Sequence, residues 1–246
     1  MPLKLPRFIG HRGLKDLAPE NTLSSIELAI NNNIKWIEVD IQFSKDNIPF
    51  LLHDETFNRT TNGNGFPKDY DFDQIKTLDA GSWFNNKYKN LSIPSLEEVL
   101  NICTNNKIGL NIEMKESIFY QIQNLENLLK ILKKPKYELE FYISSFNINV
   151  LNKMREVMPD ILLGYLVDDI KNNEELSKII YKSINSKCFC IGLNIDIVTK
   201  EIIRKIKENN FIITIYSNKC IKSYQVDRLL ELGVDSIFID NIIELD

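Results

Sequence analysis

Two observations in the sequence predict a closed (β/α)8 TIM barrel as the fold class. The first is that eight short apolar segments typical of strands begin near residues 6, 35, 108, 140, 161, 188, 211 and 236. Helical patterns or a hairpin separate them, and regular strand and helix alternation of this length indicates a parallel sheet that closes on itself. The second is that no strand is followed by the glycine-rich phosphate turn that an open nucleotide-binding sheet would carry.

The composition indicates one domain covering residues 1–246. The chain is 43% hydrophobic, which is ample for a single large core. A formal net charge of -4 argues against binding of nucleic acid, because such proteins need a basic surface. No apolar run is long enough for a signal peptide or a membrane span, so we expect a cytoplasmic protein with no stable membrane insertion. The spacing of the four cysteines fits neither a zinc site nor a disulfide framework, so we expect reduced thiols.

The first elements are a strand and a helix joined by a polar loop. An apolar strand is expected over residues 5–10, and it ends at His11. Apolar residues at helical spacing predict a helix over about residues 23–32, and either Asn21 or Thr22 is suited to cap its first turn. The strand therefore delivers a histidine to its carboxyl end.

Residues 36–53 predict a β-hairpin that carries two acids on one face. Two runs rich in apolar and β-branched residues, 36–43 and 48–53, flank a polar turn. Glu38 and Asp40 are two positions apart in the first run, so a strand places both carboxylates on the same face. Neighbouring carboxylates inside a sheet need a compensating cation, and a divalent metal ion is the obvious candidate.

The register of this hairpin also concerns a histidine. If Phe43 pairs with Ile48 across the turn, the residue opposite Glu38 is His53. On this register two acids and an imidazole converge at one place.

A long irregular segment over residues 55–94 follows the hairpin. It has no clear periodicity, and it is rich in turn residues and aromatic residues. A segment of this length inside an α/β chain is usually a functional excursion over the site. We expect a small capping insertion whose aromatic residues form a core of their own rather than a platform for a ligand.

Strands and helices alternate regularly from residue 95 onward. Ser95 and Glu98 form a capping box, which predicts the start of a helix. The next strand, over residues 107–114, carries Glu113 near its end and is followed by Lys115. Further helices are expected over residues 121–134, 147–157, 173–181, 197–208 and 221–232, the last with Gly233 as its C-cap.

Polar side chains gather at the carboxyl ends of the predicted strands. In a (β/α)8 barrel this face holds the active site, so these residues are candidates for function. We interpret one of them, Asp240, as a structural residue that closes the last strand. The set consists of His11, Asp40, Glu113, Lys115, Ser144, Ser145, Asn194, Ser217 and Asp240.

Seven short motifs follow one another along the chain: GHRG at 10–13, APENT at 18–22, EVD at 38–40, HDETFNRTTNGNG at 53–65, IPSLEEVL at 93–100, NIEMK at 111–115 and GVDSIFID at 233–240. Together, and in this order, they resemble the motifs of the glycerophosphodiester phosphodiesterase family. The resemblance covers nearly the whole chain and is densest from residue 8 to residue 115. It implies a TIM-barrel enzyme that hydrolyses glycerophosphodiesters, such as glycerophosphocholine and glycerophosphoethanolamine, to sn-glycerol 3-phosphate and an alcohol.

The resemblance also implies a metal site and a loop that orients its neighbours. Glu38, Asp40 and Glu113 match the family's ligands of a divalent cation. Three carboxylates supply oxygen ligands, which suit Ca²⁺, Mg²⁺ or Mn²⁺. Glu20 and Asn21 match the family's loop beside the first histidine, where an orienting role is expected.

The catalytic and phosphate-binding groups are implied in the same way. His11 and His53 match the general acid and general base, while Arg12 and Lys115 match the groups that bind the phosphate. An alternative without a metal ion remains open, in which Arg12 and Lys115 are ordinary ion-pair partners of the acids. Whether water or a hydroxyl of the substrate's own glycerol attacks the phosphorus also remains open.

The chain departs from the family pattern near its C-terminus. Where the family typically has Trp-Thr-Val-Asn in the penultimate strand, residues 215–218 read Ile-Tyr-Ser-Asn. The usual threonine before the final aspartate is Ile239, and the usual proline after it is Ile242. We expect these changes to affect the preference for the alcohol part of the substrate.

Two other functions are compatible with the same barrel. A lysophospholipase D-type phosphodiesterase would need an apolar channel or a membrane-binding face, and no basic amphipathic helix is evident in the sequence. A barrel without catalysis could serve as a binding module. The presence of both histidines and all three acids argues against this second alternative.

Overall fold

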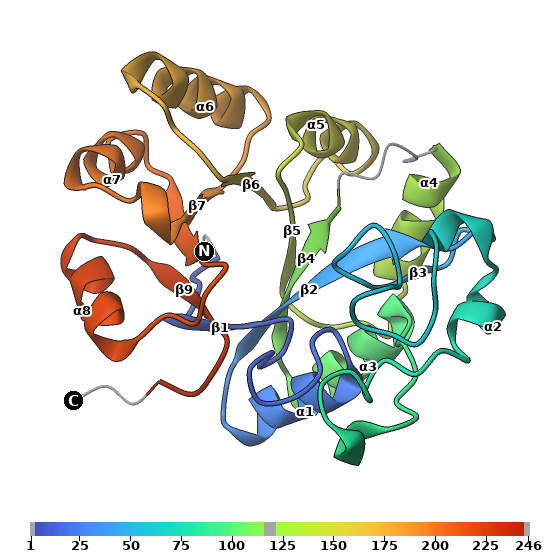
Figure 1. Cartoon of the computed structure of the whole chain (residues 1–246). Helices are drawn as coiled ribbons and strands as arrows, with labels where there is room; N and C mark the ends of the chain where they lie inside the picture. Colours follow the sequence, from blue (N-terminus) through green and yellow to red (C-terminus); the bar gives the residue numbers. More distant parts are fainter. Residues whose placement is uncertain (1–2, 116–121, 244–246) are drawn as a thin grey trace.

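The computed structural model describes residues 3–115 and 122–243, and its central element is a closed barrel of parallel strands (Figure 1). The barrel strands are β1 (Phe8–His11), β2 (Trp36–Phe43), β4 (Gly109–Met114), β5 (Phe141–Ser145), β6 (Leu163–Val167), β7 (Cys190–Asn194), β8 (Ile212–Tyr216) and β9 (Ser236–Ile239). Each strand pairs in parallel with its neighbours, and β1 pairs with both β9 and β2, which closes the ring. The predicted (β/α)8 fold class is therefore confirmed.

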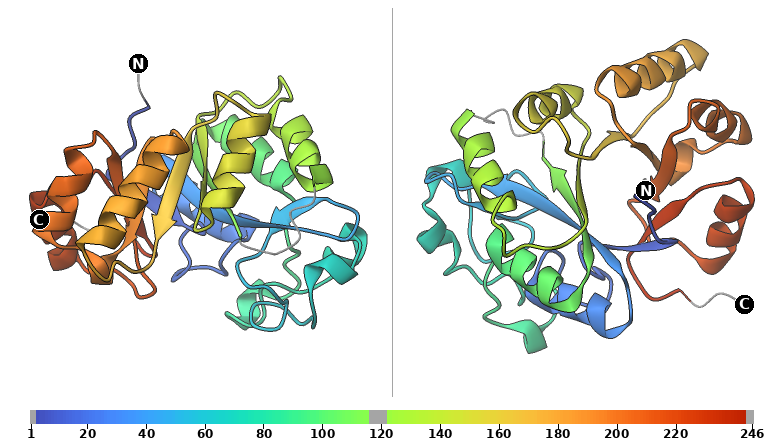
Figure 2. Two further views of the ribbon diagram at one scale, coloured as in Figure 1. Left: turned by 90° about the horizontal axis from the view of Figure 1, so that it is seen from above. Right: turned by 180° about the vertical axis from the view of Figure 1, so that it is seen from behind.

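Helices cover the outside of the barrel, as Figures 1 and 2 show from three directions. The outer helices are α1 (Leu23–Asn31), α3 (Leu96–Asn106), α4 (Ile122–Leu132), α5 (Ile148–Val157), α6 (Asn173–Asn185), α7 (Lys200–Lys207) and α8 (Ser223–Glu231). Thr22, rather than Asn21, caps α1, because its side chain accepts a hydrogen bond from the amide of Ser25. Ser95 and Glu98 form the predicted capping box of α3.

Two helices start two or more residues later than predicted, and one of them, α8, begins at Ser223 instead of residue 221. The helix expected over residues 197–208 begins at Lys200, because the side chain of Thr199 accepts a hydrogen bond from a backbone amide of the first turn. A short 3-10 helix, η3 (Ile195–Ile197), occupies part of the preceding segment. Another predicted helix start, at Gln121, lies outside the described residues.

The predicted hairpin forms with a register one residue away from the expected one. β2 pairs antiparallel with β3 (Pro49–Leu51), and Phe43 lies opposite the first residue of β3 instead of Ile48. The turn is the reason: the amide of Ser44 donates to the carbonyl of Ile48 at 3.1 Å, and Asn47 adopts a left-handed conformation with φ 63°. The loop therefore contains three residues rather than four, a length that requires one left-handed residue.

The predicted pairing of Glu38 with His53 is wrong for the same reason. β3 ends at Leu51, so His53 lies in the loop beyond the strand and outside the ladder. The prediction that Glu38 and Asp40 share one face of β2 is confirmed, since their carboxylates lie in the same cluster. Both side chains are buried, because a barrel strand is covered on its two faces.

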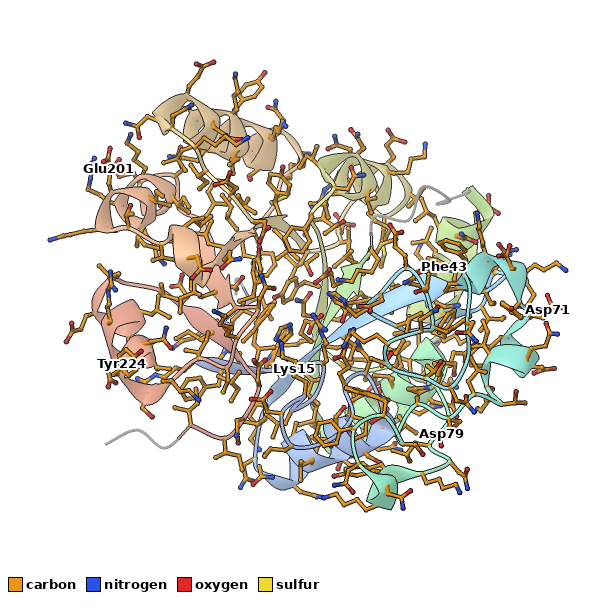
Figure 3. All side chains as sticks on the ribbon, viewed as in Figure 1. Lys15, Phe43, Asp71, Asp79, Glu201 and Tyr224 are labelled. Atoms are coloured by element: carbon orange, nitrogen blue, oxygen red, sulfur yellow. The ribbon has the colours of Figure 1, made fainter. Side chains whose placement is uncertain are left out.

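Apolar side chains form two layers, one inside the barrel and one between the strands and the helices. Figure 3 shows side chains filling the ring of strands as well as the space around it. The inner layer includes Ile9, Trp36, Tyr142 and Phe238. Gly109 lies beside the Trp36 ring, and a Cβ atom at this glycine would lie 2.1 Å from the ring. The absence of a side chain at residue 109 therefore makes room for the indole.

Residues 55–94 form an irregular segment beside the barrel with a small apolar core of its own. It contains η1 (Pro67–Asp69), α2 (Phe72–Ile75) and η2 (Asn86–Tyr88). Phe57 and Phe72 pack against Phe50, so β3 also contributes to this core. Phe84 contacts both Trp83 and Tyr88, and Trp83 and Phe84 also line a hollow at the barrel mouth. In the described part of the chain, no helix combines the length and apolar character that crossing a membrane requires.

We predict that Gly109→Ala destabilises the fold by overpacking. The added methyl group would collide with the buried Trp36 ring, which typically lowers the free energy of unfolding by about 1–3 kcal/mol. Urea denaturation of Gly109→Ala, Trp36→Leu and the double variant measures the effect. We expect the double variant to lose less stability than the sum of the single variants. A Gly109→Ala protein as stable as the wild type would contradict the close packing described here.

Candidate active site

Three buried carboxylates meet at the carboxyl end of the barrel. Glu38 and Asp40 come from β2 and Glu113 from β4, and the parallel register of these strands places Asp40 beside Glu113. Their potential ligand oxygens all lie within 4.8 Å of one another. The side chains are almost inaccessible to solvent, with Glu38 0% and Asp40 1% exposed. The structure thus brings together the three acids predicted from the sequence as a candidate metal site.

Two cations lie against these acids. Lys115 Nζ is 2.8 Å from Asp40 Oδ1 and also pairs with Glu113. Arg12 Nε is 3.2 Å from Asp40 Oδ2, and the backbone amide of Arg12 donates to Glu38 Oε2 at 3.0 Å. Both charged groups therefore contact Asp40, whereas Glu38 receives an uncharged amide.

The pKa values of the acids follow from these contacts. Burial raises the pKa of Glu38 well above its usual value, and the neighbouring Asp40 and Glu113 charges add to the rise. Burial also raises the pKa of Glu113, although Lys115 opposes the shift. Burial alone would raise the pKa of Asp40, but Lys115 and Arg12 outweigh it and hold that pKa well below its usual range. Arg12 and Lys115 also attract the Glu38 carboxylate, but they do not offset the rise in its pKa.

The donor set fits a divalent metal ion. Among residues 3–115 and 122–243, Glu38 Oε1 is a buried oxygen with no hydrogen-bond partner. A buried carboxylate oxygen without a partner is costly, and a cation that binds oxygen removes the cost. Glu38, Asp40 and Glu113 offer only oxygen ligands, which suits hard cations such as Ca²⁺ and Mg²⁺.

His11 ends β1 beside the acids and is held by a residue from the opposite end of the chain. Its Nδ1 lies 2.7 Å from Asp240 Oδ1, and its Nε2 lies 3.9 Å from Glu38 Oε2. The hydrogen bond with His11 and attraction to Lys15 lower the pKa of Asp240 despite its burial, so the carboxylate accepts and Nδ1 carries the proton. Burial lowers the pKa of His11 to about 4. This arrangement leaves Nε2 of a neutral imidazole facing Glu38.

His53 approaches the acids from the loop after β3. Its Nδ1 lies 2.7 Å from Asp54 Oδ1, so Nε2 is again the nitrogen available to a ligand. Burial lowers the pKa of His53, while the nearby Asp40 carboxylate opposes the shift. The side chain of Gln42 donates to the carbonyl of Asp54 and anchors this loop to β2. The two histidines thus lie beside different acids: His11 faces Glu38, and His53 lies near Asp40.

The loop between β1 and α1 holds its functional side chains in an unusual backbone conformation. Arg12 and Asn21 both have positive φ, 53° and 55°. Gly13 follows with φ 84°, and a Cβ atom there would lie 2.5 Å from the backbone of Ser25. In this conformation the Asn21 side chain donates to Asp40 Oδ2 at 2.8 Å and accepts from the Asp40 amide at 3.1 Å. The orienting role expected for Asn21 therefore has a geometric basis.

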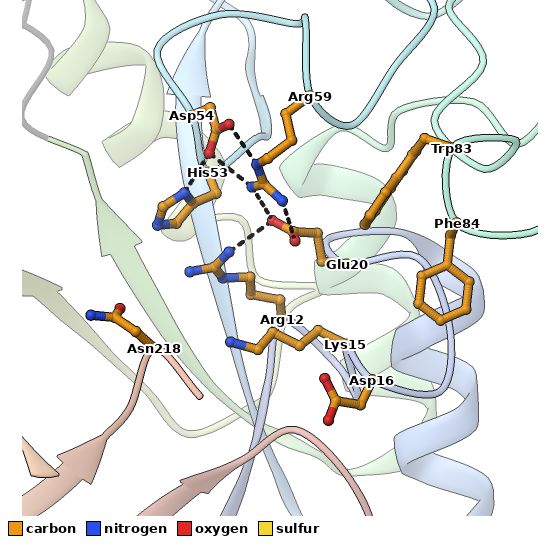
Figure 4. Close-up of a pocket in the computed structure, with 10 residues that line it drawn as sticks. All are labelled: Arg12, Lys15, Asp16, Glu20, His53, Asp54, Arg59, Trp83, Phe84 and Asn218. Carbon is orange, nitrogen blue, oxygen red and sulfur yellow. Dashed lines mark hydrogen bonds and ion pairs between the residues drawn. The ribbon is translucent and has the colours of Figure 1, made fainter. Parts of the chain in front are cut away.

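The expected orienting residue Glu20 belongs to an ion-pair network that the sequence did not predict. Glu20 Oε1 accepts from Arg12 Nη1 at 2.8 Å, and both of its oxygens accept from Arg59 at 2.8 Å. Arg59 also donates to both oxygens of Asp54, at 2.7 and 2.8 Å (Figure 4). Sequence reasoning missed Asp54 and Arg59, although both lie in the motif that begins at His53. The sequence analysis interpreted Asp240 only as a residue that closes the last strand, although its carboxylate accepts a hydrogen bond from His11.

Two open hollows of about 500 Å³ each meet at His53 and Asn218. The first, drawn in Figure 4, is lined by basic residues such as Arg12 and acidic residues such as Glu20, together with Trp83 and Phe84 of the insertion. The second is lined by Glu113 and the adjacent Lys115, and by other residues that include Phe146, Asp168 and Tyr216. His53 therefore borders both hollows.

A (β/α)8 barrel with acids, histidines and basic side chains at its carboxyl-end mouth has the architecture of a TIM-barrel enzyme. The model of the glycerophosphoryl diester phosphodiesterase family matches residues 11–244, and the chain belongs to this family.

Individual relatives agree with this assignment. A glycerophosphodiester phosphodiesterase of Bacillus altitudinis is 33% identical over 237 residues, covering 96% of this chain and 95% of the relative. One of Caldanaerobacter subterraneus subsp. tengcongensis is 30% identical over 233 residues, covering 95% and 93%. Among solved structures, an Oleispira antarctica phosphodiesterase in complex with the product sn-glycerol-3-phosphate matches with a TM-score of 0.87 and 29% identity, covering 96% and 93%.

We predict that Glu20 contributes stability that is lost in acid. Burial alone would raise the pKa of Glu20, but hydrogen bonds and attraction from Arg59 and Arg12 lower it from 4.5 to about 2. A folded-state pKa below the unfolded value stabilises the protein above pH 4.5, and this stabilisation disappears as the pH falls towards 2. A shift of this size corresponds to about 3 kcal/mol.

The measurement is the free energy of unfolding as a function of pH for the wild type and Glu20→Gln. We expect the wild type to lose stability more steeply than the variant between pH 4.5 and pH 2. Equal slopes for the two proteins would show that Glu20 is not held as described.

Proposed function

We propose that this protein hydrolyses glycerophosphodiesters, such as glycerophosphocholine and glycerophosphoethanolamine, to sn-glycerol 3-phosphate and an alcohol. One divalent cation, Ca²⁺, Mg²⁺ or Mn²⁺, would assist the reaction. The observation that carries the proposal is the convergence of three carboxylates, two histidines and two basic side chains at one barrel mouth. The names of the relatives and the product in the Oleispira antarctica structure support the same class of substrate.

Charge balance favours an anionic substrate once a cation is bound. The three carboxylates face two basic side chains, Arg12 and Lys115, which leaves an excess of negative charge. A divalent cation held by Glu38, Asp40 and Glu113 would reverse the sign and attract the phosphodiester monoanion. When bound, such an ion supplies Lewis acidity and a fixed position for a phosphoryl oxygen.

Arg12 and Lys115 are suited to bind the phosphate. Arg12 lines the hollow beside His53, and among the described residues its side chain makes one hydrogen bond, from Nη1 to Glu20, while its charge is also paired with Asp40. Arginine offers a planar fork that matches phosphate oxygens, whereas lysine adds a point charge. Donors already held in place stabilise the negative charge that develops on the phosphoryl oxygens during the reaction.

His11 and His53 are suited to transfer the two protons that hydrolysis requires. His11 Nδ1 is hydrogen-bonded to Asp240 and His53 Nδ1 to Asp54, so that Nε2 of each ring remains available for proton transfer. One histidine would take a proton from the attacking oxygen, and the other would give a proton to the leaving alcohol oxygen. Each carboxylate would hold its ring in the required tautomer and orientation.

We also propose that residues 55–94 form a capping insertion over the substrate. Trp83 and Phe84 of this segment line the hollow that contains Arg12 and His53. An apolar wall here would limit the access of water to the reacting phosphate.

The experiment that tests the function is turnover of glycerophosphocholine and glycerophosphoethanolamine with and without a chelator. We expect hydrolysis that the chelator abolishes and that added Ca²⁺, Mg²⁺ or Mn²⁺ restores. We expect Glu113→Gln to lower kcat/KM by at least about 10²-fold, because even residues behind a metal ligand contribute up to that factor. Glu97→Gln, a charge change on the outer helix α3, is the control and should retain activity.

A panel of lysophospholipids completes this experiment. Faster turnover of lysophospholipids than of glycerophosphodiesters would move the assignment to a lysophospholipase D-type enzyme. No turnover of either class under any metal condition would leave the barrel as a binding module.

We predict that each histidine is needed for the chemical step. His11→Gln and His53→Gln should each lower kcat by about 10²- to 10⁴-fold, because each removes one positioned proton-transfer group. Steady-state kinetics on glycerophosphocholine measures the loss, and circular dichroism checks the fold of each variant. A folded variant that retains wild-type kcat would remove that histidine from the mechanism.

A further inference from the structure

We propose that Arg59 is a positioning residue of the active site, which fixes His53 and Arg12 relative to each other by joining Asp54 to Glu20. The inference rests on the proposed function for the roles of His53 and Arg12. Its basis is a continuous chain of side-chain contacts, visible in Figure 4, that no assigned role explains.

The Arg59 guanidinium is held by two carboxylates in two forks. Nε and Nη2 donate to the two oxygens of Asp54 at 2.7 and 2.8 Å. Nη1 and Nη2 donate to the two oxygens of Glu20 at 2.8 Å. Both forks have the bidentate geometry in which an arginine and a carboxylate fix each other's orientation. All three nitrogens of Arg59 are therefore engaged with these acids.

This engagement distinguishes Arg59 from a residue that binds phosphate. Arg59 lines the same hollow as Arg12, so a direct contact with the substrate would be the simpler expectation. Its donors, however, point at Asp54 and Glu20, and four of its five N–H groups are used in these bonds. Arg12 differs, because among the described residues its side chain makes one hydrogen bond, from Nη1 to Glu20.

Each carboxylate that Arg59 binds also contacts a functional side chain and fixes its position. Asp54 Oδ1 lies 2.7 Å from His53 Nδ1, and Glu20 Oε1 accepts from Arg12 Nη1 at 2.8 Å. Without Arg59, two carboxylates would lie close together with no common counter-ion, and their repulsion would move them apart. The His53 ring and the Arg12 fork would then lose their supports together.

Arg59 also connects the insertion to the barrel loops. It belongs to the irregular segment that follows β3, whereas Glu20 belongs to the loop between β1 and α1. Its guanidinium lies 6.0 Å from the centroid of the Trp83 ring, another residue of the insertion. The placement of the insertion and the geometry of the catalytic groups are thus linked through one side chain.

The test compares Arg59→Met and Arg59→Lys with Lys76→Met. Lysine keeps the charge but offers one donor atom, which cannot form two forks. Lys76 is the matched control, because it also joins the insertion to the barrel, through a 2.7 Å ion pair with Glu98 of α3. It is similarly exposed, 42% against 44% for the Arg59 side chain, and it does not line the hollow that Arg59 lines.

We expect Arg59→Met to lower kcat/KM for glycerophosphocholine by about 10²-fold, the loss typical of a misplacement of reacting groups by about 1 Å. KM should rise and kcat should fall together, because one arm of the network supports Arg12 and the other supports His53. Arg59→Lys should be intermediate, and Lys76→Met should stay within about twofold of the wild type in both constants, as expected for an exposed ion pair. A further variant, Arg59→Ala, leaves space for a small cation. Guanidinium added at millimolar, non-denaturing concentration should partly restore the activity of Arg59→Ala and should not raise the activity of His53→Gln.

Two results would overturn the inference. One is an Arg59→Met enzyme with wild-type kinetics. The other is an Arg59→Met enzyme whose kcat falls at unchanged KM by the fraction of protein that is unfolded, together with an Arg59→Ala enzyme that guanidinium does not restore. This combination would show that Arg59 affects stability alone.

Failure of the proposed function would look different from failure of this inference. A wild-type protein that turns over none of the substrates would reject the function. The Arg12 arm is then tested by the affinity for inorganic phosphate, which should be weaker in Arg59→Met than in Lys76→Met. Equal phosphate affinities would reject the positioning role.

Discussion

Repulsion between three buried carboxylates is the constraint on which the rest of the site depends. Glu38, Asp40 and Glu113 lie too close together to remain ionised without positive charge, and the surrounding residues supply it unevenly. Lys115 and Arg12 compensate Asp40, while Glu38 retains a buried oxygen without a partner. The same imbalance explains why the cluster fits a cation and why the protein carries two basic side chains there despite its net negative charge.

Backbone conformation and long-range contacts maintain this charged arrangement. The loop after β1 places Arg12 and Asn21 in left-handed conformations, which direct the Arg12 amide to Glu38 and the Asn21 side chain to Asp40. Conformations of this kind cost free energy and persist where surrounding contacts hold them, as is common at functional sites. Asp240, from the last strand, then holds His11 from the other side of the barrel closure.

The two arginines of the site, Arg12 and Arg59, differ in how many of their donors are bound to carboxylates. The Arg12 side chain makes one hydrogen bond among the described residues, to Glu20, whereas all three nitrogens of Arg59 donate to Asp54 and Glu20. In the positioning role that we propose, the insertion would act on the site through Arg59. Phe57 and Phe72 of the insertion pack against Phe50 of β3, and these contacts help to stabilise a segment with little regular structure.

The sequence by itself determined the barrel and its eight strands, because apolar periodicity is a local property that can be read without coordinates. The candidate acids and histidines came from the resemblance of its motifs to a known family as well as from their positions near strand ends. The sequence did not determine the hairpin register, which depends on the left-handed Asn47, or the place of His53 in a loop. Only the tertiary structure decided that Asp240 supports His11 and that Arg59 bridges Asp54 and Glu20. These contacts join residues far apart in the chain, and their existence depends on how the barrel closes and where the loops meet above it.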